Sequence, residues 1–100
     1  MRLNKHQIDA ITTVIKNVFG QDVRLSLFGS RLNDHAKGGD IDLLVTLDHP
    51  IERPALDVAR AQAKIIILLG DQKIDIVLDA PNLKRQAIHQ IARQEGVALC

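Results

Sequence analysis

The chain has 100 residues, of which 46% are apolar and 25% are charged, and its net charge is +1. This length and composition fit one small domain, so we expect a single domain over residues 1–100. A charge so close to zero gives no footprint for nucleic acid or a membrane surface. The two aromatic residues, Phe19 and Phe28, are too few for a platform that stacks single-stranded bases.

The first two predicted elements are a helix and a strand. Asn4, followed three residues later by Gln7, has the pattern of a capping box, and Gly20 has the position of a helix-ending glycine. A helix is therefore predicted between Asn4 and Gly20. Residues 23–28 alternate apolar and polar side chains, which predicts a strand.

The middle of the chain is expected to form a loop, a strand and a second helix. Residues 31–39 have the composition of a loop or a short helix. A strand follows over residues 40–47. Pro54 opens a helix over about residues 55–69, and Gly70 ends it.

The last third predicts a strand over residues 73–78 and, after Pro81-Asn82, a helix over about residues 83–94 that ends before Gly96. The order of elements is helix, strand, strand, helix, strand, helix. This order indicates an α+β domain in which helices cover a small three-stranded sheet.

Asp40 and Asp42 flank Ile41 at the start of the second predicted strand. Alternate side chains of a strand share a face, so the two carboxylates point the same way, with Cα atoms about 6.6 Å apart. Aspartate is unfavourable in strands, and two on one face repel each other. A divalent cation would offset that cost, and hard oxygen ligands suit Mg²⁺, with Mn²⁺ as the alternative.

A third carboxylate, Asp75, lies between Ile74 and Ile76 in the next predicted strand. If the two strands are neighbours, Asp75 completes a group with Asp40 and Asp42. Three carboxylates on one face can hold two metal ions about 3.5–4 Å apart, which suits displacement at phosphorus. Taken singly, Asp40 could be a strand-start residue, and Asp75 could face solvent at a sheet edge.

A phosphate-binding turn is predicted at Gly29-Ser30, directly after the first strand. Glycine lets the backbone approach a phosphate closely, and the Ser30 hydroxyl and the amides after the turn can bind anions. The guanidinium of Arg31 can contact a phosphate. Nine residues separate Ser30 from Asp40, which is enough chain to bring the turn beside the second strand.

Other polar residues are given ordinary roles at this stage. Asp79 flanks a turn and is expected to be a loop residue. The four histidines, His89 among them, show no metal-ligand spacing and are expected at the surface. Lys73 shares the face of Asp75 and is either a sheet-edge charge or a phosphate contact.

The second predicted helix has an apolar arc of roughly 260°, far wider than the 100° that a one-sided surface helix needs. A three-stranded sheet cannot cover all of it. We expect some of its large apolar residues to stay exposed and to form a protein interface, either for self-association or for a partner. Complete coverage by neighbouring helices is the alternative.

The segments LFGSR, GDIDLLV and KIDIVL together resemble the minimal nucleotidyltransferases, the MNT group of the DNA polymerase beta superfamily. The resemblance covers residues 23–78, and the closing segment HQIARQEGVAL also looks like the C-terminal end of that family. It implies a fold like the polymerase beta palm, with a mixed sheet.

The resemblance also implies site roles. Asp40 and Asp42 would bind Mg²⁺ and the triphosphate, and Asp75 would complete the site and help to activate the attacking hydroxyl. Gly29, Ser30 and Arg31 would hold the phosphates of a nucleoside triphosphate, with ATP expected. Many members carry Arg-Ala-Arg-Gly after Gly-Ser, and only the first Arg is matched here, so no further phosphate contact is assigned to this loop.

Small MNT proteins are often encoded beside a helical HEPN protein, which they neutralise as antitoxins, and many transfer AMP to it. The resemblance therefore implies a HEPN-type partner. Two alternatives remain open. The chain could be a non-catalytic antitoxin that acts by binding, or a transferase acting on a small molecule.

Targeting features point to the cytoplasm. The N-terminus lacks the apolar segment of a signal peptide, and the longest apolar run, Ile65–Leu69, is too short to span a membrane. The single Cys100 excludes an internal disulfide.

Overall fold

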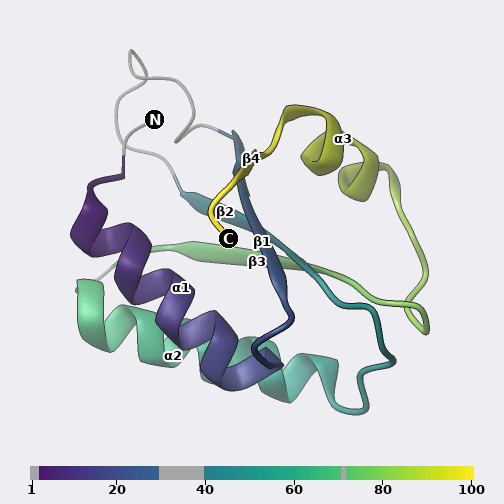
Figure 1. Cartoon of the computed structure of the whole chain (residues 1–100), viewed down its shortest axis with the longest axis horizontal. Coiled ribbons are helices and arrows are strands. Elements are labelled where there is room, and N and C mark those ends of the chain that lie inside the picture. The colour runs from purple at the N-terminus through teal and green to yellow at the C-terminus, as the bar shows by residue number, and fades with distance from the viewer. Residues whose placement is uncertain (1–2, 30–39, 71) are drawn as a thin grey trace.

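The computed structural model describes residues 3–29, 40–70 and 72–100, and these residues form three helices and one four-stranded sheet (Figure 1). This arrangement confirms the expected α+β class. In chain order the elements are α1 (Lys5–Phe19), β1 (Arg24–Phe28), β2 (Ile41–Thr46), α2 (Pro54–Leu69), β3 (Ile74–Asp79), α3 (Ala87–Glu95) and β4 (Val97–Ala98).

The sheet is mixed and has the strand order β3-β2-β1-β4. Strand β1 is antiparallel to β2 and to β4, whereas β2 and β3 are parallel. The expected number of three strands was wrong, because β4 pairs with Ser26 and Leu27 of β1. Two residues are too few to show an alternating pattern, and their pairing depends on backbone groups that carry no sequence signal.

Helix α1 begins and ends where the sequence predicts. The backbone N–H of Gln7 donates to Oδ1 of Asn4 at 2.8 Å, and the Asn4 N–H donates to Oε1 of Gln7 at 3.0 Å. These two bonds form the capping box and satisfy donors that the first helical turn leaves unpaired. The helix ends at Gly20, whose φ of 112° favours glycine.

Helix α2 begins at Pro54, within one residue of the expected start, but α3 begins four residues later than expected. The reason is Asn82. Its side chain accepts a hydrogen bond from the Ile51 N–H at 3.0 Å and donates to the Ile51 carbonyl at 2.8 Å. These bonds tie the segment after β3 to the start of the connection into α2, so the helix forms only beyond it.

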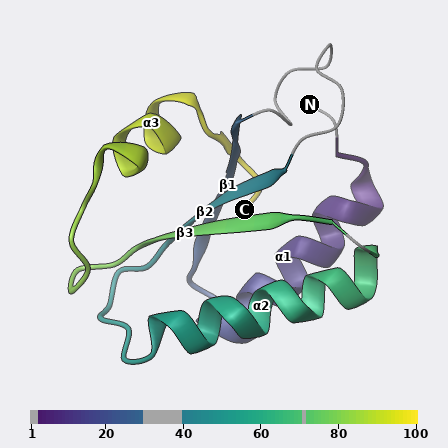
Figure 2. The ribbon, with the colours of Figure 1, turned by 180° about the vertical axis from the view of Figure 1, so that it is seen from behind.

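The two faces of the sheet carry different cores. Helices α1 and α2 cover one face and enclose the large core, while α3 lies over the other face (Figures 1 and 2). Strand alternation sends Leu43 into the large core and Asp42 and Leu44 to the face under α3. The small core on that face consists of Phe28, Leu44 and Ala92, with Val77 packed against them.

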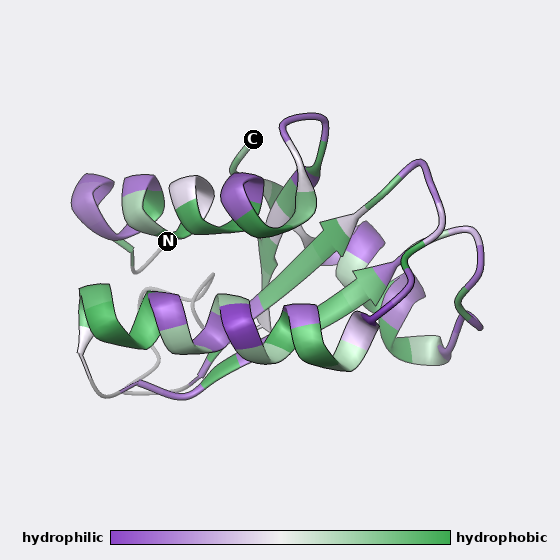
Figure 3. Ribbon diagram, turned by 90° about the horizontal axis from the view of Figure 1, so that it is seen from below, coloured by the Kyte–Doolittle hydropathy of each residue, from purple (hydrophilic) through white to green (hydrophobic). Residues whose placement is uncertain are grey.

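Part of the apolar arc of α2 remains at the surface, as the sequence predicts. Ile65 is fully buried, whereas Ile66, Ile67 and Leu68 are 39%, 81% and 53% exposed. The hydrophobic colouring of the C-terminal end of α2 is visible in Figure 3. No helix in the described part of the chain is long and apolar enough to cross a membrane.

Candidate functional site

Two of the predicted carboxylates are neighbours in the sheet. The parallel register of β2 and β3 pairs Asp42 with Asp75, and the antiparallel register of β1 and β2 pairs Asp42 with Phe28. Paired residues on adjacent strands lie about 5 Å apart, and their side chains point to the same face. Asp75, Asp42 and Phe28 therefore form one row across the face under α3.

The third carboxylate, Asp40, lies just before β2. Its Oδ2 atom is 3.4 Å from Nζ of Lys73, which lies just before β3, and the backbone N–H of Ile41 donates to the Lys73 carbonyl at 3.0 Å. Both side chains of the ion pair are partly or largely exposed, so the pair contributes little to stability. Lys73 thus contacts a carboxylate of the predicted site.

The carboxylates affect one another electrostatically. Burial raises the pKa of Asp42, and the charges of Asp75 and Asp40 and a hydrogen bond with Asp75 raise it further, while the Lys73 charge opposes the change. The pKa therefore rises because a half-buried carboxylate is crowded by two others. A bound cation would reverse this balance, because it favours the ionised form.

Gly29 brings the end of β1 against the same carboxylate. A Cβ atom at this position would lie 3.1 Å from Cγ of Asp42 and closer still to Oδ2. The residue also has φ of 80°, a conformation that side chains rarely adopt. Glycine is thus required here for two independent reasons, and the backbone at the predicted turn borders the carboxylates. The predictions for Ser30, Arg31 and the rest of the 31–39 loop lie outside the described residues.

The donor set has the right chemistry for Mg²⁺, because it consists of carboxylate oxygens that repel one another without a cation. Within residues 3–29, 40–70 and 72–100, however, no three Asp, Glu, His or Cys side chains form a ready-made coordination group. Coordination by all three carboxylates therefore requires side-chain movement, and Asp40 is held by Lys73.

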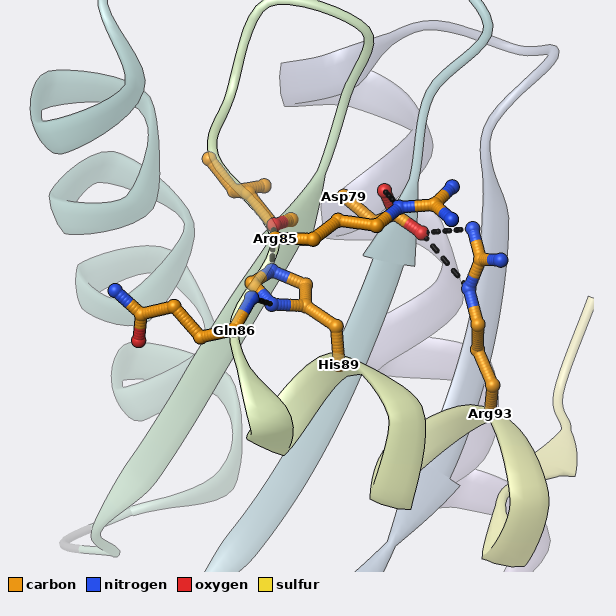
Figure 4. Close-up of polar contacts among 6 residues, drawn as sticks. Asp79, Arg85, Gln86, His89 and Arg93 are labelled. Atoms are coloured by element: carbon orange, nitrogen blue, oxygen red, sulfur yellow. Dashed lines mark hydrogen bonds and ion pairs between the residues drawn. The ribbon is translucent and has the colours of Figure 1, made fainter.

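The opposite end of the same face carries a charged cluster that the sequence did not reveal. Asp79 was expected to be a loop residue, but it ends β3 and its side chain is only 4% exposed. Nε of Arg93 donates to Oδ2 of Asp79 at 3.0 Å, Nη2 of Arg93 contacts the same oxygen, and Nε of Arg85 lies 3.4 Å from Oδ1 (Figure 4).

The arginines determine the charge state of this carboxyl. Burial acts to raise the pKa of Asp79, but the hydrogen bond and charge of Arg93, together with Arg85, outweigh burial and lower it. Asp79 is thus held ionised. In the sequence, one signal could have predicted that Asp79 lies on the face under α3. Asp79 follows Val77 by two strand positions, and residues at this spacing share a face.

His89 was expected at the surface, but it is buried and anchors α3 to the sheet. Its Nδ1 accepts a hydrogen bond from the Gln86 N–H at 2.9 Å, so the ring proton lies on Nε2, which contacts the Leu78 carbonyl at 2.7 Å (Figure 4). The helical spacing of His89 and Arg93, four residues apart, places both on the face toward β3.

This fold agrees with a comparison against known families. The nucleotidyltransferase domain family matches residues 8–98, so the chain belongs to that family, within the polymerase beta superfamily. The four-stranded mixed sheet with its three helices, all within the described residues, is consistent with the nucleotidyltransferase fold. The general activity of the chain is nucleotidyl transfer. No curated protein shows significant similarity to the chain.

Proposed function

We propose that this chain is a magnesium-dependent nucleotidyltransferase that moves AMP from ATP to a hydroxyl group of a partner protein. The main support is the register of β2 and β3, which pairs Asp42 with Asp75. The charge of Asp40 raises the pKa of Asp42, and the Gly29 backbone borders the Asp42 carboxylate. Carboxylates that can hold a cation beside a glycine turn that can approach a phosphate suit phosphoryl chemistry.

In this mechanism Asp40 and Asp42 would hold Mg²⁺, or Mn²⁺, which would neutralise charge on the triphosphate. Asp75 accepts the proton of the attacking hydroxyl, while the oxygen of that hydroxyl forms a bond to the α-phosphorus. The bond between the α-phosphorus and the bridging oxygen breaks, and pyrophosphate leaves with that electron pair. Gly29 and, outside the described residues, Ser30 and Arg31 bind the phosphates.

The test uses a matched pair of variants, Asp75→Asn and Asp9→Asn. Asp9 is an exposed carboxylate on α1, on the opposite side of the sheet. Each variant is incubated with ATP, Mg²⁺ and the product of the neighbouring gene, and AMP addition is followed by mass spectrometry. We expect Asp75→Asn to lose transfer and Asp9→Asn to keep it. Equal transfer by both variants would refute the role of Asp75.

The acceptor in this proposal is a HEPN-type helical toxin, and the chain is its antitoxin in a toxin–antitoxin pair. Support for a protein partner comes from the exposed end of α2, where Ile67 is 81% exposed beside Ile66 and Leu68. Three adjacent large apolar residues at the surface favour contact with another protein. A helical partner can place its own apolar side chains against this end of α2.

This surface is tested with Ile67→Lys and, as the control, Ala55→Lys on the same helix, since Ala55 is also exposed and lies at the other end of α2. Co-purification should show that Ile67→Lys loses the partner while Ala55→Lys keeps it. Light scattering on the chain alone shows whether the same surface supports self-association instead. A partner that binds both variants equally would exclude this end of α2 as the interface.

A non-catalytic antitoxin is the second candidate. It is favoured by the observation that the carboxylates in the described residues do not form a ready-made coordination group. The two functions differ in one respect. A binding antitoxin with Asp75→Asn would still neutralise its partner in growth assays, whereas a catalytic one would lose neutralisation together with AMP transfer.

A further inference from the structure

The arginine-rich end of the α3 face contains a recess that the proposed reaction does not use. A cavity of about 500 Å³ lies between the ends of β2 and β3 and the segment around α3, lined in part by Arg24, Thr46, Arg85 and Arg93. A second cavity of about 370 Å³ shares Arg24, Thr46 and Arg93 and adds Ser26. The two cavities share three lining residues, so they are adjacent, and together they are called the recess below.

The recess has an excess of positive charge. Three guanidinium groups line it, and Asp79 is the one carboxylate among its lining residues. Arg93 uses two of its five N–H donors on Asp79, and Arg85 uses one. Arg24 makes no side-chain hydrogen bond or ion pair with another described residue, although its charge acts weakly on the exposed Asp48. Several donors thus remain available to a ligand.

The available donors approach from different elements. Arg24 and Ser26 project from β1, Thr46 from β2 and Arg93 from α3. A phosphate group has three terminal oxygens and can accept from several directions, whereas a carboxylate has only two oxygens. Two guanidinium groups and two hydroxyls around one space therefore fit a phosphate better than a carboxylate.

The recess also has room and apolar surface for the rest of a small molecule. Its volume lies in the range of ligand sites, and Leu44, Leu47 and Leu83 contribute to its lining. A nucleic-acid strand is a poorer fit, because the chain as a whole has a net charge of only +1.

We propose that this recess is a second ligand site, which binds the phosphate group of a phosphorylated small molecule without a metal ion. It is separate from the carboxylates, because Thr46 lies four residues beyond Asp42, or about 13 Å along β2. The site does not depend on the proposed function, because none of its residues belongs to the carboxylate group.

The test is an NMR titration of the full chain in EDTA with inorganic phosphate, AMP and succinate. Phosphate and AMP should shift the backbone amides of Ser26, Thr46 and Arg93. Tighter binding of AMP than of phosphate would show that the ligand's organic part occupies the recess, and equal binding would show that the phosphate alone provides the affinity. Both results support the site, whereas succinate binding as tightly as phosphate would overturn the phosphate assignment.

Matched variants locate the binding. Arg24→Gln should weaken phosphate about tenfold, since a charge-assisted contact is lost, and Arg53→Gln, an exposed arginine at the start of α2, should change nothing. Thr46→Val provides a second test within the recess. Asp42→Asn should keep full phosphate affinity, which separates this site from the proposed reaction. Unchanged affinity in both recess variants, or shifts confined to Gly29 and Asp42, would overturn the proposal.

Discussion

Asp42 and Asp79 lie on neighbouring strands and on the same face of the sheet, yet their pKa values move in opposite directions. Burial disfavours ionisation at both positions. At Asp42 the neighbours are Asp75 and Asp40, which add to the effect, and at Asp79 they are arginines, which reverse it. The charge of the neighbouring side chains thus gives the two carboxyl groups their opposite pKa shifts.

The two ends of the face differ in the charges that surround their carboxylates. The arginine end carries its own counter-charges, because Arg85 and Arg93 come from the segment that leads into α3 and from α3 itself (Figure 4). At the carboxylate end, the exposed Lys73 lies beside Asp40, with its Nζ atom 3.4 Å from Oδ2 of Asp40. The charges of Asp75 and Asp40 raise the pKa of Asp42, so a cation bound there would stabilise its ionised form, and nucleotidyl transfer uses such a cation.

The largest expected effect is the loss of AMP transfer in Asp42→Asn. In the proposed mechanism this variant loses a ligand of the cation, which costs several kcal/mol of transition-state stabilisation, so the rate should fall by roughly 100-fold or more. The rate is measured under single-turnover conditions, with Asp9→Asn as the control. If Asp42→Asn transferred AMP at the wild-type rate, the carboxylate end of the face would have no role in the reaction.

The next effect concerns Gly29→Ala, compared with Gly20→Ala. Both glycines have positive φ, so both substitutions add strain of about 1–3 kcal/mol. Only at Gly29 does the new Cβ meet Asp42, since Gly20 has open space. Calorimetry with ATP and Mg²⁺ should show weaker binding, by about tenfold, for Gly29→Ala alone. Equal ATP affinity in the two variants would place the phosphates elsewhere.

At the other end, Asp79→Asn keeps the side-chain volume and removes the charge. It weakens hydrogen bonds to two guanidinium groups, and we expect the free energy of unfolding to fall by about 1–2 kcal/mol. Urea unfolding measures this, and Asp9→Asn again serves as the control. An Asp79→Asn variant as stable as the wild type would show that the arginine cluster does not stabilise the fold.

The smallest effects are opposite pH dependences. Because the pKa of Asp79 is lowered from 3.8, its ionised form adds stability above that value and the gain is lost as the pH falls. The pKa of Asp42 is raised from 3.8, so the folded state binds more protons and stability falls as the pH rises through this range. In metal-free buffer, Asp42→Asn should therefore be more stable than the wild type at neutral pH. The measurement is the free energy of unfolding against pH for Asp42→Asn and Asp79→Asn. The same pH dependence in both variants would contradict the opposite pKa shifts assigned to these two carboxyl groups.

Strand alternation is a local signal, and it alone predicts that Asp40 and Asp42 share a face. The place of Asp75 beside Asp42 was predicted only on the condition that the two strands are neighbours, and the pairing of β2 with β3 meets that condition. The capping box between Asn4 and Gln7 is equally local, and the structure confirms it. Patterns within a few residues report such features directly.

The arginine end depends on contacts between distant residues. Arg93 reaches Asp79 across fourteen positions, and His89 reaches the Leu78 carbonyl across eleven. Neither pairing follows from periodicity within one element, since each depends on where α3 packs. Strand β4 was missed for the same reason, because two residues pair with β1 through backbone groups alone.

The most direct test of the difference between the two ends is the effect of saturating Mg²⁺ on the melting temperature of the wild type and Asp42→Asn. A ligand that binds only the folded state stabilises it. Asp79 already has its arginine partners, so the cation should act at the carboxylate end. We predict that Mg²⁺ raises the melting temperature of the wild type and leaves that of Asp42→Asn unchanged. An equal rise in both proteins, or no rise in the wild type, would contradict this assignment.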